Sequence, residues 1–136
     1  MYAMVKHALD HPLGDLPLRE KLRKLRAEKG AGAKVVMAFD DVSVPLPPMY
    51  DPDIRSVIMD LAEQYCVEEG ITDIKFICSI ALHRFIRPDE FRMICGKRLF
   101  DKYHSTGAMF NFNAVDKEHS TWLGQTEEGE CVRVCT

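Results

Sequence analysis

Residues able to move a proton stand just after two apolar stretches of the sequence. Asp41 and Ser43 follow the stretch 34–39, and His83 follows the stretch 74–80. Histidine ordinarily titrates near about pH 6.5, which suits a general base close to neutral pH. A carboxylate beside an imidazole can orient the ring and raise its pKa. His83 and Asp41 are therefore the candidate catalytic residues; the alternative is that both are structural, with Asp41 capping a turn.

Both apolar stretches are predicted to be β-strands of one parallel sheet. KVVMAF at 34–39 and IKFICSI at 74–80 are apolar without alternation, which is typical of strands buried on both faces. Between them, apolar residues recur at helical spacing from Ile54 to Tyr65, after Asp51 and Pro52 as a helix start. This order predicts a right-handed parallel crossover, and ligands of such sheets bind beyond the carboxyl ends of the strands. The loop that carries Asp41 and Ser43 and the loop that carries His83 are expected to meet there.

Helices are predicted on either side of this unit. Leucines 18, 22 and 25 give the charged run 19–29 one apolar face, whereas residues 1–16 are expected to be extended. Pro88 begins a short helix that ends at Gly96, and a second short helix is expected over 97–103.

Short strands are predicted near the end of the chain, at 109–112, 121–123 and 131–134, with a turn at 128–129. The last two strands would form a β-hairpin. We therefore expect a single α/β domain over residues 1–136, with a doubly wound, largely parallel, Rossmann-like sheet and a C-terminal β-hairpin.

The composition disfavours several classes of partner. The chain has 136 residues, of which 46% are hydrophobic and 29% charged, enough for a real core. A formal net charge of -3 gives no broad attraction to nucleic acid or anionic lipid, so neither is an expected partner. No apolar run approaches the roughly 20 residues of a membrane span, and the N-terminus lacks the apolar core of a signal peptide. A cytoplasmic location is expected.

Two pairs of possible metal ligands are spaced four residues apart. His7 and His11 would share a helical face, but no third ligand is near in sequence, and we expect surface residues. Cys131 and Cys135 have the same spacing, but their stretch is predicted to be a strand, where such positions lie too far apart to act together, and no redox site is predicted there. The five cysteines contain no Cys-x-x-Cys pair, and most are expected to be small buried apolar residues. No metal site is predicted within this chain.

Several short motifs, in order, resemble the N-terminal domain of the lactate racemase family, the nickel-pincer-nucleotide racemases and epimerases of 2-hydroxy acids. Leu82-His83-Arg84 is similar to the family's Thr-His-Arg-Pro, and Pro88-Asp-Glu-Phe91 matches the acidic helix start that follows. Asp41-Val-Ser-Val-Pro45 stands where the family reads Asp-x-Thr-Arg-Pro. The other similar segments are Ala8–Leu18, Asn111–Ala114 and Leu123–Gly129.

The resemblance implies specific roles for these residues. His83 falls on a catalytic histidine that exchanges a proton with the substrate hydroxyl while a hydride moves to and from the cofactor's pyridinium ring. Asp41 falls on an active-site aspartate. Arg84 and Ser43 are assigned to substrate binding, and the implied cofactor is the nickel-pincer nucleotide.

Two departures from the family pattern limit what this chain can do alone. Val44 replaces an arginine expected to help hold the substrate carboxylate, for which Arg84 or Arg87 is the possible substitute. The family's cofactor-bearing lysine, nickel-binding histidine and second catalytic histidine lie farther along a much longer chain.

Three hypotheses follow. The first is an N-terminal domain or subunit of a racemase-like isomerase, acting on a small 2-hydroxy acid with residues from a second polypeptide or in a homo-oligomer. The second is a non-catalytic structural or interaction subunit that kept the fold and lost the site. The third is a stand-alone hydroxy-acid-binding domain.

Overall fold

The computed structural model of the protein describes the whole chain except residues 44–50, 117, 119 and 136, and Cys135 only by its backbone. Val44 and Pro45, in the segment that was compared with the family's Asp-x-Thr-Arg-Pro, therefore lie outside the described residues. In the described part of the chain, no helix has both the length and the apolar character needed to cross a membrane.

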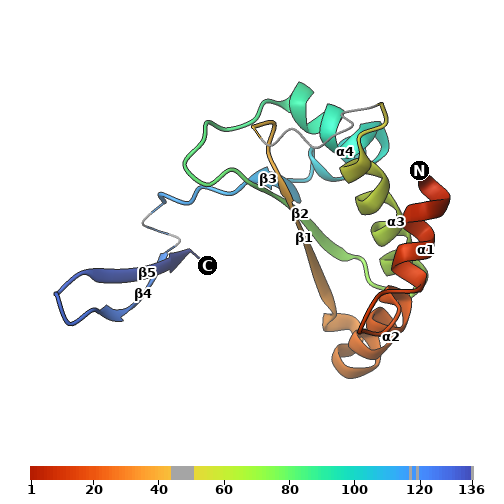
Figure 1. Ribbon diagram of the computed structural model, residues 1–136, viewed down its shortest axis with the longest axis horizontal. Coiled ribbons are helices and arrows are strands. Elements are labelled where there is room, and N and C mark those ends of the chain that lie inside the picture. The colour runs from red at the N-terminus through yellow and green to blue at the C-terminus, as the bar shows by residue number, and fades with distance from the viewer. Residues whose placement is uncertain (44–50, 117, 119, 136) are drawn as a thin grey trace.

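A three-stranded parallel sheet forms the centre of the domain (Figure 1). β1 (Lys34–Asp40) pairs with β2 (Asp73–Ser79), which pairs with β3 (Met109–Asn111). Helix α3 (Ile54–Glu68) connects β1 to β2, and α4 (Pro88–Tyr103) connects β2 to β3. The predicted α/β class, the parallel sheet and the strand–helix–strand unit are confirmed.

The helices lie on one side of this sheet (Figure 1). On that side Ile74, Phe76 and Cys78 of β2 are buried in the main core, whereas Lys75 between them is exposed. β1 alternates in the same way, and Val36 keeps 56% of its surface exposed. The prediction that these strands are buried on both faces is wrong, because an apolar run does not reveal whether the second face has a cover.

Two helices precede the sheet. α1 (Tyr2–Asp10) occupies the segment that was expected to be extended, so that prediction is wrong. The Tyr65 hydroxyl on α3 donates a hydrogen bond of 2.7 Å to Asp10 and holds the end of α1 against the domain. α2 (Leu18–Lys29) is as predicted, and a short 3-10 turn, η1 (Gly30–Gly32), leads into β1.

Of the two connecting helices, α3 begins later than predicted, whereas α4 has a kink where two short helices were predicted. α3 begins after Asp53, whose carboxylate accepts from the Arg55 amide at 2.8 Å, and not at Asp51 and Pro52. In α4, Gly96 has φ 78°, a left-handed value that suits glycine, and it breaks the helix where two short helices were predicted.

The chain ends in an antiparallel hairpin, β4 (Ser120–Gln125) and β5 (Cys131–Cys135), as predicted. It stands away from the sheet and the helices (Figure 1). Cys66, Cys78 and Cys95 are buried free thiols, as expected, and burial raises the pKa of Cys66 to about 11 and that of Cys78 to about 12. These two thiols are protonated packing residues at neutral pH.

Candidate active site

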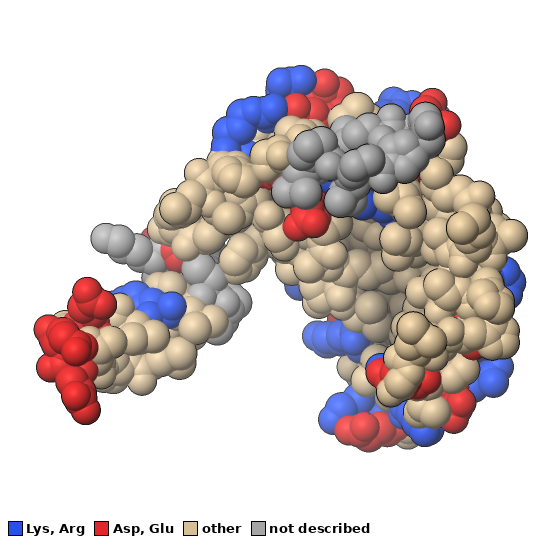
Figure 2. Space-filling view, in the orientation of Figure 1, with Lys and Arg blue, Asp and Glu red and all other residues tan. Residues whose placement is uncertain are grey.

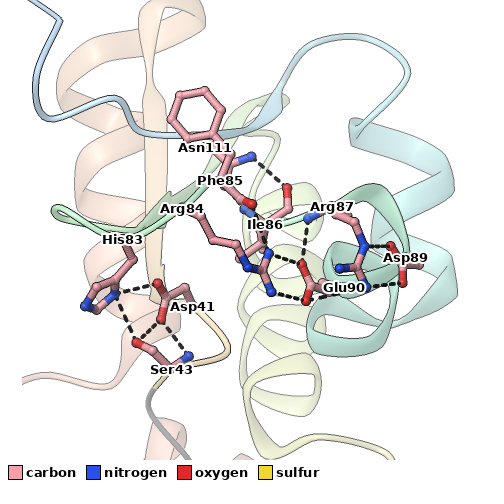
Figure 3. Close-up of polar contacts among 10 residues, drawn as sticks. All are labelled: Asp41, Ser43, His83, Arg84, Phe85, Ile86, Arg87, Asp89, Glu90 and Asn111. Carbon is pink, nitrogen blue, oxygen red and sulfur yellow. Dashed lines mark hydrogen bonds and ion pairs between the residues drawn. The ribbon is translucent and has the colours of Figure 1, made fainter.

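The carboxyl ends of β1 and β2 lie side by side, with Asp40 opposite Ser79. Asp41 follows the first strand directly, and His83 lies in the loop after the second. Across this edge, His83 Nδ1 is 2.7 Å from Asp41 Oδ2 (Figure 3). The expected meeting of the two loops is therefore confirmed, while the chemical role of these residues stays a prediction.

Hydrogen bonds around Asp41 determine which ring nitrogen of His83 carries the proton. Asp41 Oδ1 accepts from the Ser43 amide at 2.8 Å and from the Ser43 hydroxyl. Because that hydroxyl proton is used, Ser43 Oγ accepts at its 3.0 Å contact with His83 Nδ1. Asp41 Oδ2 is also an acceptor, so Nδ1 must be the donor and neutral His83 is the Nδ1–H tautomer.

Nε2 of His83 is left with a free lone pair in this arrangement. Among the described residues, none lies within hydrogen-bonding distance of Nε2. The side chain of His83 is 52% exposed, whereas that of Asp41 is 3% exposed. Nε2 therefore has no partner among the described residues, while the carboxylate that orients the ring is covered, and this arrangement suits a general base.

Asp41 is ionised in this environment. Burial by itself would raise the pKa of Asp41, but hydrogen bonds from the Ser43 hydroxyl and amide and from His83 outweigh it and lower that pKa. The carboxylate is therefore charged at neutral pH and can stabilise a positive charge on His83.

A buried ion pair holds the loop that carries Asp41. Arg55 Nη1 donates to the backbone oxygens of Asp40 and Asp41, both at 2.9 Å. Its other nitrogens bind Asp53 at 2.7 and 3.0 Å, and both side chains are over nine-tenths buried. This pair was not predicted from the sequence, where its one signal is an arginine two residues after a helix-capping aspartate.

The loop that carries His83 is fixed at both ends. It turns sharply after β2: the His83 amide bonds to Ile80 O at 2.8 Å, and Ala81 has φ 49°, a left-handed value that few side chains adopt. Farther on, Asn111 of β3 accepts from the Ile86 amide and donates to the Ile86 carbonyl, each at 3.0 Å. The Asn111 side chain thus satisfies both backbone groups of Ile86 and anchors the loop.

Arg84 reaches Glu90 instead of the His83 ring (Figure 3). Its two terminal nitrogens bind the two Glu90 oxygens at 2.7 and 2.8 Å, and Glu90 also accepts from the Arg87 amide. Arg84 lowers the pKa of Glu90 to about 2, with help from that amide. Of the assigned substrate-binding residues, Ser43 lies at the His83 ring, whereas Arg84 is engaged by a carboxylate of its own chain.

The described residues contain no group of three or more His, Cys, Asp or Glu side chains placed to hold a metal ion. His7 and His11 are exposed neighbours with ring centroids 4.6 Å apart, on α1 and at its end. The thiol of Cys135 lies outside the described residues. The donor set of the described residues therefore does not fit a nickel-binding group.

Fold and site together define a Rossmann-like α/β domain with an exposed histidine, oriented by a buried aspartate, at the carboxyl edge of its parallel strands. The chain belongs to the lactate racemase N-terminal domain family, whose model matches residues 1–136.

Solved structures agree in fold. The chain is similar to the lactate racemase apoprotein from Thermoanaerobacterium thermosaccharolyticum at 18% identity and TM-score 0.69, over 98% of this chain and 28% of that one. It is also similar to a protein from Thermotoga maritima at 18% identity and TM-score 0.52, over 81% of this chain and 24% of that one. The chain therefore spans less than a third of either relative. No curated protein matches it.

Proposed function

We propose that this chain supplies the proton-transfer half of the active site of a lactate racemase-like enzyme that acts on a small 2-hydroxy acid. The observation that carries the proposal is the His83–Asp41 pair, with Nδ1 bound to a buried carboxylate and Nε2 open. Membership of the lactate racemase N-terminal domain family supports the substrate class.

In this proposal Nε2 of His83 removes the proton of the substrate hydroxyl. Oxidation of a 2-hydroxy acid to a 2-oxo acid also takes a hydride from C2, and removing the proton in step with the hydride avoids a cationic intermediate. The imidazolium formed is stabilised by ionised Asp41 at 2.7 Å. When a hydride returns to C2, His83 gives the proton back to the substrate oxygen in one configuration; by the family resemblance, a second histidine outside this chain would do so in the other.

Substrate binding is proposed for Ser43 and Arg84. Ser43 is exposed beside the ring and fixed by Asp41, so it can contact a substrate held at Nε2. Arg84 would have to leave Glu90, or share its charge, to bind the substrate carboxylate. Asp41, Arg55 and Asn111 act as positioning residues in this scheme.

The hydride acceptor lies outside the described residues. The family resemblance implies a nickel-pincer nucleotide, but these residues offer no metal-binding group for it. We therefore assign the cofactor's ligands to a second polypeptide, in a cytoplasmic complex, and limit this chain's contribution to proton transfer and substrate binding.

The test uses the complex purified from its source through a tag on this chain. Metal analysis, native mass spectrometry and chiral chromatography of lactate measure nickel, subunits and interconversion of the enantiomers. His83→Ala should reduce turnover by at least about a hundredfold, the usual range for a lost general base, without dissociating the complex. His7→Ala, a change at an exposed histidine on α1, is the matched control. Unchanged turnover in His83→Ala would remove the catalytic role of His83.

The alternative is a non-catalytic interaction subunit, favoured by the bidentate pair with Glu90 that engages Arg84, the residue next to His83 in the sequence. It predicts a stable complex in which neither histidine variant changes turnover.

A further inference from the structure

The parallel sheet has the topology of one half of a doubly wound sheet. The chain runs β1–α3–β2–α4–β3, and the strands lie in the order β1-β2-β3, so each crossover moves one strand farther from β1. A doubly wound sheet consists of two such halves, which meet at the first strand of each in the order 3-2-1-4-5-6. The described residues supply one half, and the second half belongs beside β1.

The outer edge of β1 is open, since its one sheet partner among the described residues is β2. An edge strand presents unpaired backbone N–H and C=O groups, which proteins usually protect with proline, charged side chains or a covering segment. β1 is seven residues long, and its central residues 35–39 are all apolar and include no proline. β3, at the other edge, has three residues. β1 is therefore the edge better suited to accept another strand.

The face of the sheet that is turned away from the helices, hereafter the bare face, is also open (Figure 1). Val36, Ile77 and Phe110 lie on it and line a groove of about 550 Å³. The polar residues of this groove are Lys75, Asn111, Asn113 and Asp116. Among the described residues, the C-terminal hairpin does not line the groove, and it stands across a hollow from the body of the domain (Figure 2). An amphipathic helix, whose apolar stripe is flanked by polar side chains, suits a groove of this mixed character.

One binding mode closes both the edge and the face, because parallel crossovers are right-handed. α3 and α4 connect strands that move away from β1 in one direction, and both helices lie on one face. Strands added beyond β1 move in the opposite direction, so right-handed crossovers place their helices on the opposite face. That face is the bare face. A single α/β unit that pairs with β1 therefore also covers the uncovered side of the sheet, as parallel sheets normally require.

The candidate active site lies where the two halves meet. In doubly wound sheets the ligand binds beyond the carboxyl ends of the strands, at the point where the strand order reverses. Here that point is the carboxyl end of β1, which Asp41 and Ser43 follow, with His83 2.7 Å from Asp41. This chain covers 28% of the lactate racemase apoprotein, so most of that relative has no counterpart here. The β1 edge is thus the place from which the missing half of the site can approach.

We infer that the second polypeptide of the proposed function pairs a parallel β-strand with the free edge of β1 and lays an amphipathic helix on the bare face, against Val36. The inference rests on the proposed function for the existence of that polypeptide, and on the sheet for its kind and its place. The partner is an α/β unit, and the assembled sheet has both faces covered and the His83–Asp41 pair at its switch point.

Hydrogen exchange followed by mass spectrometry compares β1 in the isolated chain with β1 in the complex purified from its source through a tag on this chain. Exchange of β1 should be at least about tenfold slower in the complex, since its free amides gain hydrogen bonds. Val36→Asp should weaken the complex at least about tenfold in a dilution series followed by native mass spectrometry, because it buries a carboxylate under the partner's helix. Leu13→Asp is the matched control, since Leu13 is 101% exposed between α1 and α2. Circular dichroism checks that both variants are folded.

Equal exchange of β1 in the isolated chain and in the complex would overturn the inference, as would a complex that Val36→Asp leaves intact. A chain that purifies without another polypeptide, as a monomer or as a dimer of itself, would overturn it too. The catalytic proposal fails separately. If β1 is protected but His83→Ala leaves turnover unchanged, the docking mode holds and the proton-transfer role does not; if β1 stays unprotected while His83→Ala abolishes turnover, the reverse follows.

Discussion

Two buried carboxylates in this domain are held in opposite ways. Glu63 on α3 is 1% exposed and accepts from Arg98 and Lys102 at 2.6 Å and from the Tyr103 hydroxyl at 2.7 Å. Asp41, directly after β1, is 3% exposed, and its carboxylate is bound by Ser43 and by the half-exposed ring of His83.

The comparison shows what separates a structural carboxylate from one that serves a site. Burial raises the pKa of Glu63, but Arg98, Lys102 and Tyr103 together lower it below its ordinary value. All three of these donors belong to α4, so the carboxylate of Glu63 is fully used in holding α3 to α4. The network of Asp41 instead ends in an imidazole with an open nitrogen. We infer that Glu63 stabilises the packing of α3 on α4, whereas Asp41 orients the ring of His83.

Glu63→Gln should have the largest effect on stability. The substitution removes the charge that Arg98 and Lys102 share. Loss of one partner of a buried pair costs about 3–5 kcal/mol, and here about 2 kcal/mol is expected because both cations are half exposed and can return to water. Urea unfolding measures the change. Glu28→Gln, at an exposed glutamate of α2, is the control and should leave the urea midpoint unchanged.

Asp41→Asn should destabilise the domain less. The asparagine can still accept from the Ser43 amide, so about 1 kcal/mol is expected from the weakened hydrogen bonds. The same urea experiment measures it, with Asp40→Asn as the neighbouring control. A loss as large as that of Glu63→Gln would mean that Asp41 is a second structural carboxylate.

Much of the fold and part of the site could be predicted from the sequence. Apolar patterns in the sequence predicted α2, α3 and the strands of the described residues. Because the carboxyl ends of parallel strands lie at one edge of a sheet, the contact between Asp41 and His83 could also be predicted. Periodicity could not show that one face of the sheet is bare, because cover depends on where helices pack. The Arg55–Asp53 and Arg84–Glu90 pairs were also missed, since they depend on side-chain directions within loops and helix starts.

Acid should destabilise the protein through both carboxylates. The folded-state pKa of Asp41 and that of Glu63 are lowered, so their contribution is complete above the unfolded pKa, near about 4, and is lost as the pH falls through the folded value. Urea midpoints of the wild type should therefore fall most steeply below about pH 4. Glu63→Gln should flatten this dependence more than Asp41→Asn does; equal slopes would contradict the ranking.

Arg84→Ala should have the smallest effect on folding. Its ion pair with Glu90 is bidentate, but the Arg84 side chain is 57% exposed, and exposed pairs contribute little. The urea midpoint should not change measurably, with Arg87→Ala as the control for the adjacent pair with Asp89. A clear loss of stability would make Arg84 a structural residue and would weaken its proposed role in substrate binding.

The most direct test of the central claim is the tautomer of neutral His83, measured by long-range proton–nitrogen correlation spectroscopy on the isolated chain. The wild type should carry its proton on Nδ1, leaving Nε2 as the base. In Asp41→Asn the side-chain oxygen must still face the Ser43 amide, so its NH₂ group faces Nδ1 and should move the proton to Nε2. A wild-type ring protonated on Nε2, or a tautomer that Asp41→Asn leaves unchanged, would contradict the account.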